Sequence, residues 1–188
     1  MTTARTGTTL SICPWVERFL PCVPDDGGRV LDVACGLGRH SLLAALYGYR
    51  VLAVDRDPAF AGRALGFPEI EFRRADLESG GWPLGSEKFA GIIVCNYLHR
   101  PLFPHLVDAL EPGGVLICQT FTLPQAEVFG KPANPAHWLR AGELLSLVRP
   151  LDVAAYECGK AGGAYVERIC AVKEAQPGAA LRFPLRSK

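Results

Sequence analysis

The chain contains no run of about 20 consecutive apolar residues of the kind that spans a bilayer, and its N-terminal residues hold no apolar core of signal-peptide length. It also has no excess of charge of either sign, since 20 Lys and Arg oppose 19 Asp and Glu for a formal net charge of +1. An even balance gives no electrostatic footprint for nucleic acid. These absences predict a globular protein that does not enter a membrane, and they give no indication of nucleic-acid binding.

Paired cysteine motifs are missing as well. The sequence has 7 cysteines, an odd number, and no two of them are spaced as C-x-x-C. Neither a disulfide framework nor a zinc site follows from that arrangement. Most of the cysteines stand in apolar runs, where a free cysteine behaves as a small hydrophobic side chain. We therefore expect a location in the reducing cytoplasm and no bound metal.

No internal repeat and no low-complexity tract interrupts the 188 residues. A chain of this length usually folds as one domain. We expect a single domain over residues 1–188, with a loose arm at 1–13 and a flexible tail at 175–188.

Apolar runs alternate with helical periodicity through most of the chain. Strands are predicted at 29–35, 49–55, 70–77, 89–96 and 115–122, and helices at 14–20, 38–48, 58–66 and 104–114. In the helix at 38–48, Leu42, Leu43 and Leu46 are expected to share one face. Such alternation favours an α/β fold with an open parallel sheet and helices on both faces.

The pattern changes after the fifth predicted strand. Residues 123–141 have no clear period, which indicates a loop over one end of the sheet. A short helix is predicted at 141–148. Two further strands, at 151–159 and 164–173, are joined by a glycine-rich turn and therefore form a β-hairpin.

The segment "LDVACGLGRHS", residues 31–41, follows the first strand and begins a helix. Two glycines in this position indicate a backbone that approaches a nucleotide closely. A dinucleotide fingerprint requires glycine at its first, third and sixth positions. Gly36 and Gly38 occupy two of them, but the sixth is Ser41. A nicotinamide-dependent oxidoreductase therefore remains an alternative, although the third glycine of its fingerprint is missing.

The same segment resembles the first motif of class I S-adenosylmethionine (SAM)-dependent methyltransferases, in which an acid and a short gap precede G-x-G. Asp32, Gly36 and Gly38 have this spacing. Over about residues 14–172 the chain is similar to small bacterial methyltransferases of the tellurite-resistance type, in a branch with the motifs "NYLHRP" (96–101), "QTFT" (119–122) and "WLRAGEL" (138–144). Gln119 departs from the glutamate expected in that branch. The resemblance implies a Rossmann-like, seven-stranded, mostly parallel sheet with an antiparallel last strand, and SAM as the cofactor with S-adenosylhomocysteine (SAH) as its product.

The glycine loop and the end of the second strand supply the first candidate cofactor residues. The helix N-terminus after Gly38 suits a carboxylate, and Arg39 can pair with it; a solvated arginine is the alternative. Asp55 follows Gly36 by 19 residues (55 − 36). A carboxylate at that spacing accepts hydrogen bonds from a ribose diol, although it can also cap the next helix.

The resemblance implies that Asp76 accepts from the adenine amino group, with a loop cap as the alternative, and that Leu77 provides a backbone N–H and an apolar contact. A buried acid is costly unless it is bonded, so Asp32 is expected to hold the glycine loop or the ammonium group of SAM. The complete predicted cofactor set is Asp32, Gly36, Gly38, Arg39, Asp55, Arg56, Asp76, Leu77, Cys95 and Asn96.

The "NYLHRP" motif leaves the fourth strand at its carboxyl end, where ligands of parallel sheets bind. Tyr97 is a candidate to place an aromatic face near the sulfonium. His99 is a candidate general base, or else it fixes the loop. Arg100 and Arg140 are candidates to bind an acidic substrate, with structural roles as the alternative. His137 and Trp138 are expected to line a lid.

The acceptor is inferred by elimination. Amino-methyltransferases of DNA carry an N-P-P-Y type sequence after the fourth strand, and cytosine-C5 enzymes need a Pro-Cys nucleophile there; this chain has neither in that region. We therefore expect a small-molecule acceptor, such as a thiol, a chalcogen or a carboxylate-bearing metabolite. A SAM-binding module without turnover is a further alternative.

Overall fold

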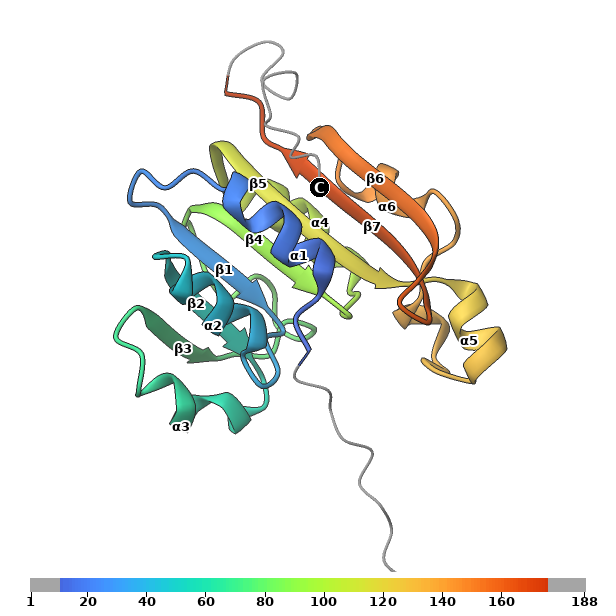
Figure 1. The fold of residues 1–188 in the computed structure, drawn as a ribbon, viewed down its shortest axis with the longest axis horizontal. Helices are drawn as coiled ribbons and strands as arrows, with labels where there is room; N and C mark the ends of the chain where they lie inside the picture. The colour runs from blue at the N-terminus through green and yellow to red at the C-terminus, as the bar shows by residue number, and fades with distance from the viewer. Residues whose placement is uncertain (1–10, 176–188) are drawn as a thin grey trace, which may run out of the picture.

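The computed structural model describes residues 11–175, which form one seven-stranded sheet in the order β3-β2-β1-β4-β5-β7-β6 (Figure 1). Strands β1 to β5 are parallel, and β7 is antiparallel to both of its neighbours, β5 and β6. The predicted fold class is confirmed, including the antiparallel last strand. Most of the predicted arm at 1–13 and nearly all of the predicted tail at 175–188 lie outside the described residues.

The strands are β1 Arg29–Val33, β2 Arg50–Asp55, β3 Ile70–Arg74, β4 Phe89–Cys95, β5 Leu110–Phe121, β6 Asp152–Ala161 and β7 Ala164–Val172. The α-helices are α1 Pro14–Phe19, α2 Arg39–Leu46, α3 Ala61–Ala64, α4 Phe103–Ala109, α5 Leu123–Phe129 and α6 Glu143–Leu147. Short 3₁₀ turns occupy Leu20–Cys22, Pro58–Phe60, Arg100–Leu102 and Pro135–His137.

The sheet is covered on both faces, which explains why its central strands are apolar along their whole length. Helices α1, α2 and α3 pack on one face, where Val30 of β1 belongs to their cluster, and α4 and α6 pack on the other, which receives the adjacent Leu31. In Figure 1, α1 and α2 stand in front of the sheet and α4 lies behind it. Successive residues of a strand point to opposite faces, so one apolar run supplies both cores.

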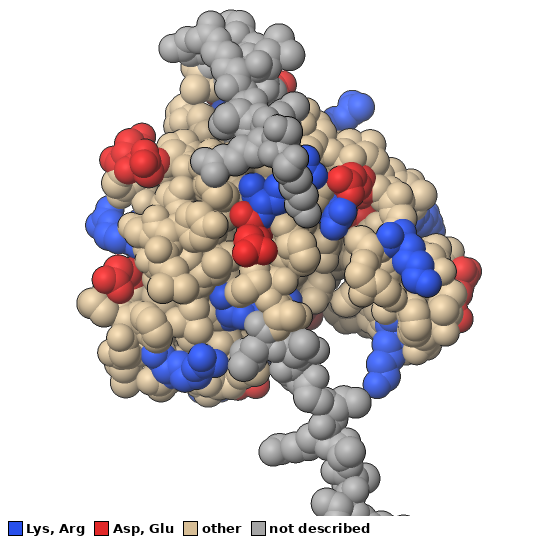
Figure 2. Space-filling model, viewed as in Figure 1, with Lys and Arg blue, Asp and Glu red and all other residues tan. Residues whose placement is uncertain are grey.

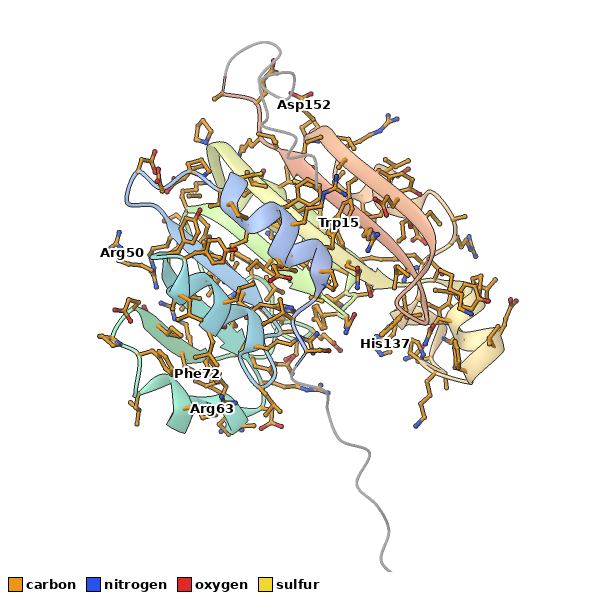
Figure 3. The ribbon with its side chains drawn as sticks, viewed as in Figure 1. Trp15, Arg50, Arg63, Phe72, His137 and Asp152 are labelled. Carbon is orange, nitrogen blue, oxygen red and sulfur yellow. The ribbon has the colours of Figure 1, made fainter. Side chains whose placement is uncertain are left out.

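Helix α1 is attached to the far end of the chain by its tryptophan. Trp15, labelled in Figure 3, is only 1% exposed, and its indole Nε1–H donates to the carbonyl of Ile169 on β7 at 3.0 Å. A buried indole needs such an acceptor. The contact joins the first helix to the last strand.

The leucine face of α2 is only partly directed at the core, because Leu42 and Leu43 pack against it while Leu46 does not. His40, Ser41 and Ala44 are the buried residues of this helix, whereas Leu46 is 80% exposed. The rotation is explained by a polar contact, because the hydroxyl of Ser41 donates to the buried carboxylate of Asp32 at 2.6 Å. Apolar spacing alone did not reveal this bond.

Two further boundaries differ from the predictions. The helix predicted to reach residue 114 ends at Ala109, and β5 already begins at Leu110. A Cβ on Gly114 would lie 3.1 Å from the carbonyl oxygen of Phe89, so this glycine allows β5 to approach β4 closely. The predicted loop at 123–141 contains α5 and the turn Pro135–His137.

Basic and acidic side chains are interspersed on the face shown in Figure 2. None of the helices formed by residues 11–175 is both long and apolar enough to span a bilayer. Within those residues, no group of three or more His, Cys, Asp and Glu side chains is arranged as metal ligands would be.

Candidate functional site

The carboxyl ends of the parallel strands meet at one edge of the sheet. Here β1 lies between β2 and β4, so the chain leaves β1 and β4 in opposite directions across the sheet. Ligands of open α/β sheets bind at such a switch point. A cavity of about 270 Å³ lies at this edge, lined by Ala34, Asp55, Arg56, Ala75, Asp76, Leu77, Glu78, Tyr97 and His137.

The loop after β1 is held in left-handed backbone conformations. Ala34 has φ 52°, Gly36 has φ 56° and Gly38 has φ 73°. Such a conformation is uncommon for a residue with a Cβ, so Ala34, which lines the cavity, is a locally strained position. Strain of this kind concentrates at ligand sites.

The two glycines of the loop are required for different reasons. A Cβ on Gly36 would meet nothing within 4 Å, whereas a Cβ on Gly38 would lie 2.2 Å from the ring of Phe60. Gly36 thus leaves open space beside the loop. Gly38 is needed for packing against Phe60, which sequence reasoning about ligand approach had missed.

Asp55 joins the end of β2 to this loop. Its Oδ2 accepts from the backbone N–H of Gly36 at 2.8 Å, and its Oδ1 accepts from the N–H of Asp57 at 2.9 Å. The capping role considered for Asp55 belongs instead to Asp57, whose Oδ1 accepts from the N–H of Ala59 at 2.9 Å. A carboxylate has about four acceptor positions, so Asp55 retains capacity for a ligand diol.

The loop after β3 forms a second acidic part of the cavity. Asp76 Oδ1 accepts from the N–H of Glu78 at 2.9 Å, and this bond lowers the pKa of the exposed Asp76 carboxyl. Leu77 is 7% exposed and Glu78 lines the cavity beside it. Glu78 was not predicted; its place directly after Asp76 and Leu77 was the available signal.

Asp32 lies behind the loop, in the core, and does not line the cavity. It is 2% exposed, and burial raises the pKa of its carboxyl to about 6, although the bond from Ser41 opposes the shift. Ser41 is the residue that replaces the third glycine of a dinucleotide fingerprint. Its hydroxyl ties α2 to β1, which gives the serine a structural reason of its own.

Arg39 and Cys95 belong to a cluster at the end of β4. Arg39 Nη2 donates to Cys95 Sγ at 3.6 Å and its Nε donates to His40 Nε2 at 3.3 Å. The N–H of Cys13 donates to the same imidazole nitrogen at 3.2 Å. Burial lowers the pKa of His40 to about 3, so its ring is a neutral acceptor for both. Neither Arg39 nor Cys95 is among the residues that line the cavity.

The residues after β4 divide between the cavity and the loop. Asn96 has φ 59° and its N–H donates to the carbonyl of Gln119 at 2.8 Å. Tyr97 lines the cavity; its hydroxyl is buried without a hydrogen-bond partner among the described residues, and burial and the nearby Glu78 carboxylate raise its pKa. His99, the predicted base, is not among the lining residues.

Arg100 is held by protein groups, as in the structural role considered as its alternative. Its guanidinium pairs with both carboxylate oxygens of Glu143, at 2.5 and 3.1 Å, and donates to the carbonyls of Ala136 and Trp138, each at 3.0 Å. The hydrogen bonds between the two groups raise the pKa of the Arg100 guanidinium and lower the pKa of the Glu143 carboxyl. The N–H of Arg140 also donates to Glu143, at 2.9 Å. Arg140 is exposed and does not line the cavity.

Residues 30–114 match the family profile described as "Methyltransferase domain". A trans-aconitate 2-methyltransferase of Rhizobium meliloti (strain 1021) is 34% identical over 107 residues, which cover 54% of this chain and 42% of that protein. The chain therefore spans less than half the length of this curated relative. Residues 30–114, matched by the family profile, contain the glycine loop, the cavity residues after β2 and β3, and the "NYLHRP" segment.

Solved structures share the fold. A 1,6-didemethyltoxoflavin-N1-methyltransferase of Burkholderia thailandensis, solved with 1,6-didemethyltoxoflavin and SAH bound, has a TM-score of 0.59 at 21% identity; the match covers 78% of this chain and 71% of that one. The cyclase SpnF has a TM-score of 0.66 at 17% identity, and the match covers 87% of this chain and 79% of the cyclase chain. These likenesses identify the Rossmann-like fold of class I SAM-dependent methyltransferases, and the cyclase shows that proteins with different activities share it.

Proposed function

We propose that this chain is a SAM-dependent methyltransferase and that the cavity at the carboxyl edge of its sheet binds the cofactor. The observation that carries the proposal is the bond from the Gly36 N–H to Asp55, which places a carboxylate beside the glycine loop of a domain that matches methyltransferases by sequence. SAM supplies the methyl group when bound and leaves as SAH.

The described residues suit the parts of this cofactor. Asp55 is proposed to accept from the ribose diol, and Asp76 with Leu77 to hold the adenine. Gly36 leaves open space in which the ligand lies against the loop backbone. Arg56 lines the same cavity, whereas Asp32 acts from behind by fixing α2 and Arg39 lies at the end of β4.

The charge of the cavity favours SAM over a nicotinamide dinucleotide. Three acidic residues, Asp55, Asp76 and Glu78, line the cavity with one arginine, Arg56. A sulfonium cation is stabilised by such surroundings, whereas a pyrophosphate is repelled. The methyltransferase-domain match also favours methyl transfer over hydride transfer.

The proposed acceptor is a small molecule. Among thiols, chalcogens and carboxylates, the relative named for trans-aconitate favours a carboxylate. We also propose that the chain belongs to the tellurite-resistance-like branch. We further propose that it forms a single domain over its whole length and is located in the cytoplasm. Tyr97 is retained as the aromatic group of the site. His99 is retained as a candidate base that would have to act from outside the cavity.

Calorimetric titration with SAH and with NAD tests the cofactor. We expect SAH to bind and NAD not to bind; binding of NAD alone would refute the proposal. Transfer of a labelled methyl group from SAM to a panel of trans-aconitate, simple thiols and tellurite then tests the activity. Binding of SAH with no transfer to any acceptor would favour the module without turnover.

A further inference from the structure

The guanidinium of Arg100 holds the backbone on both sides of His137. It donates to the carbonyl of Ala136, the residue before His137, and to that of Trp138, the residue after it, each at 3.0 Å. A guanidinium is a rigid planar fork, so two bonds to alternate carbonyls fix the local chain direction. Arg100 thereby fixes the backbone position from which the His137 side chain projects.

Glu143 in turn fixes Arg100. The carboxylate accepts from two guanidinium nitrogens, at 2.5 and 3.1 Å, which is a bidentate pair with defined geometry. We call Arg100 and Glu143 together the Arg100–Glu143 clamp. Both side chains are partly buried, at 34% and 23% exposure, so the pair is less screened than one in open solvent.

Leu139, two residues after His137, is attached to the end of β5 and the start of α5. The N–H of Leu139 donates to the carbonyl of Phe121 at 2.9 Å, and the carbonyl of Leu139 accepts from the N–H of Leu123 at 2.9 Å. Leu139 is fully buried, in the core cluster that also contains Leu144 of α6. His137 thus stands on a segment fixed two residues away to the end of β5, and Figure 3 labels it beside the part of the chain that follows α5.

The fixed imidazole lines the same cavity as the residues assigned to the cofactor, Asp55, Asp76 and Leu77. We propose that His137 contacts bound SAM or SAH in this cavity and that the Arg100–Glu143 clamp is the positioning device that holds it there. The inference rests on the proposed function and adds a residue to it. His99 of "NYLHRP" does not line the cavity; the arginine of that motif acts through a second histidine, 37 residues later in the chain (137 − 100).

Proton NMR of the imidazole Cε1–H groups tests the contact directly. The chain has only 4 histidines, so each signal is assigned from one single-substitution variant. We expect saturating SAH to shift the His137 signal more than that of His105, which stacks on Trp82 with ring centroids 5.6 Å apart. His137→Ala is expected to weaken SAH binding by about three- to tenfold, the loss that corresponds to one neutral contact.

The clamp is tested with Arg100→Met, which keeps much of the aliphatic stem but removes every donor. We expect the SAH-induced shift of the His137 signal to fall by at least about half, together with the same loss of affinity that His137→Ala shows. The double variant is expected to bind SAH no more weakly than either single variant. Arg63→Met is the matched control, since Arg63 is an exposed arginine on α3; it should leave both the shift and the affinity unchanged.

The outcomes separate this inference from the proposed function. If SAH binds and the His137 signal does not move, His137 is not a ligand contact and the inference is wrong while the cofactor proposal stands. If Arg100→Met weakens binding by the same factor in the presence and absence of the His137 side chain, Arg100 does not act through His137. If SAH does not bind to the unaltered protein, both proposals fail together.

Discussion

The carboxylate of Asp55 accepts a hydrogen bond from the backbone N–H of Gly36 at 2.8 Å, across the carboxyl ends of β2 and β1. The bond connects the residue proposed to hold the ribose with the loop proposed to face the cofactor. Both partners are therefore prearranged before a ligand arrives, which reduces the ordering that binding requires.

Asp55→Ala is expected to weaken SAH binding by about ten- to a hundredfold, since hydrogen bonds to a charged acceptor contribute about 1.5–3 kcal/mol each. Calorimetric titration measures the change. Asp57→Ala is the matched control, because Asp57 caps the turn after β2 and does not line the cavity. An affinity that is the same in Asp55→Ala and the unaltered protein would move the ribose site elsewhere.

Gly38→Ala is expected to destabilise the fold more than Gly36→Ala. Both residues have positive φ, which costs an alanine about 1 kcal/mol, but only the Cβ at position 38 would meet the ring of Phe60. Overpacking adds about 1–3 kcal/mol. Denaturant unfolding of both variants measures the difference in free energy.

A double-mutant cycle checks the cause of that difference. If the Phe60 ring is responsible, Phe60→Leu introduced into Gly38→Ala will cost less stability than Phe60→Leu in the unaltered protein, or will restore some. Equal costs in the two backgrounds would show that the ring plays no part.

The buried carboxyl of Asp32 is expected to make stability depend on pH between about 4 and 6. Its pKa is raised from 3.8 to about 6 in the folded protein, so the folded state binds more protons than the unfolded chain in this window. Stability therefore falls as the pH rises through it, by up to about 3 kcal/mol, and is level above it.

Asp32→Asn removes this titration and keeps an acceptor for Ser41. Urea unfolding of both proteins from pH 4 to 7 measures how each free energy of unfolding changes with pH. The difference between the two curves isolates Asp32, because the other carboxyl groups titrate alike in both proteins. We expect the unaltered protein to lose stability relative to Asp32→Asn as the pH rises. Parallel curves would contradict the raised pKa.

Tyr97→Phe is expected to keep SAH affinity within about threefold and to raise the free energy of unfolding by about 1 kcal/mol. The hydroxyl it removes is buried without a partner among the described residues, and an unsatisfied buried donor costs stability. The ring, which is the proposed contact for the cofactor, remains. A tenfold loss of affinity in Tyr97→Phe would instead show that the ligand binds the hydroxyl.

The strand pattern and the terminal hairpin were sufficient to predict the fold, because apolar runs of strand length report burial directly. The rotation of α2 was not predictable in this way. Leu42, Leu43 and Leu46 share one face, but the most buried face contains Ser41, which is bonded to Asp32. A single buried polar contact outweighed apolar periodicity in a helix that is only 8 residues long.

The cavity was predictable where its residues follow strand ends closely. Asp55, Asp76, Leu77 and Tyr97 each stand within a few residues of a strand, and all four line it. His137 was expected to line a lid, but that it joins these four residues follows from the path of the chain after β5, which no local pattern encodes. Likewise, the sequence around Gly38 does not predict its packing against Phe60, which lies 22 residues away (60 − 38).

The position of β7 inside the sheet has a consequence for synthesis. A ribosome releases β5 well before β7, which must insert between β5 and β6. Until then the edge of β5 presents unpaired peptide groups, and such edges invite pairing with other chains. The acceptor for the Trp15 indole, at residue 169, is likewise missing. A nascent chain that has not reached β7 therefore holds a sheet with an open side and a helix without its anchor, and we expect arrested chains of that length to be the species that chaperones bind.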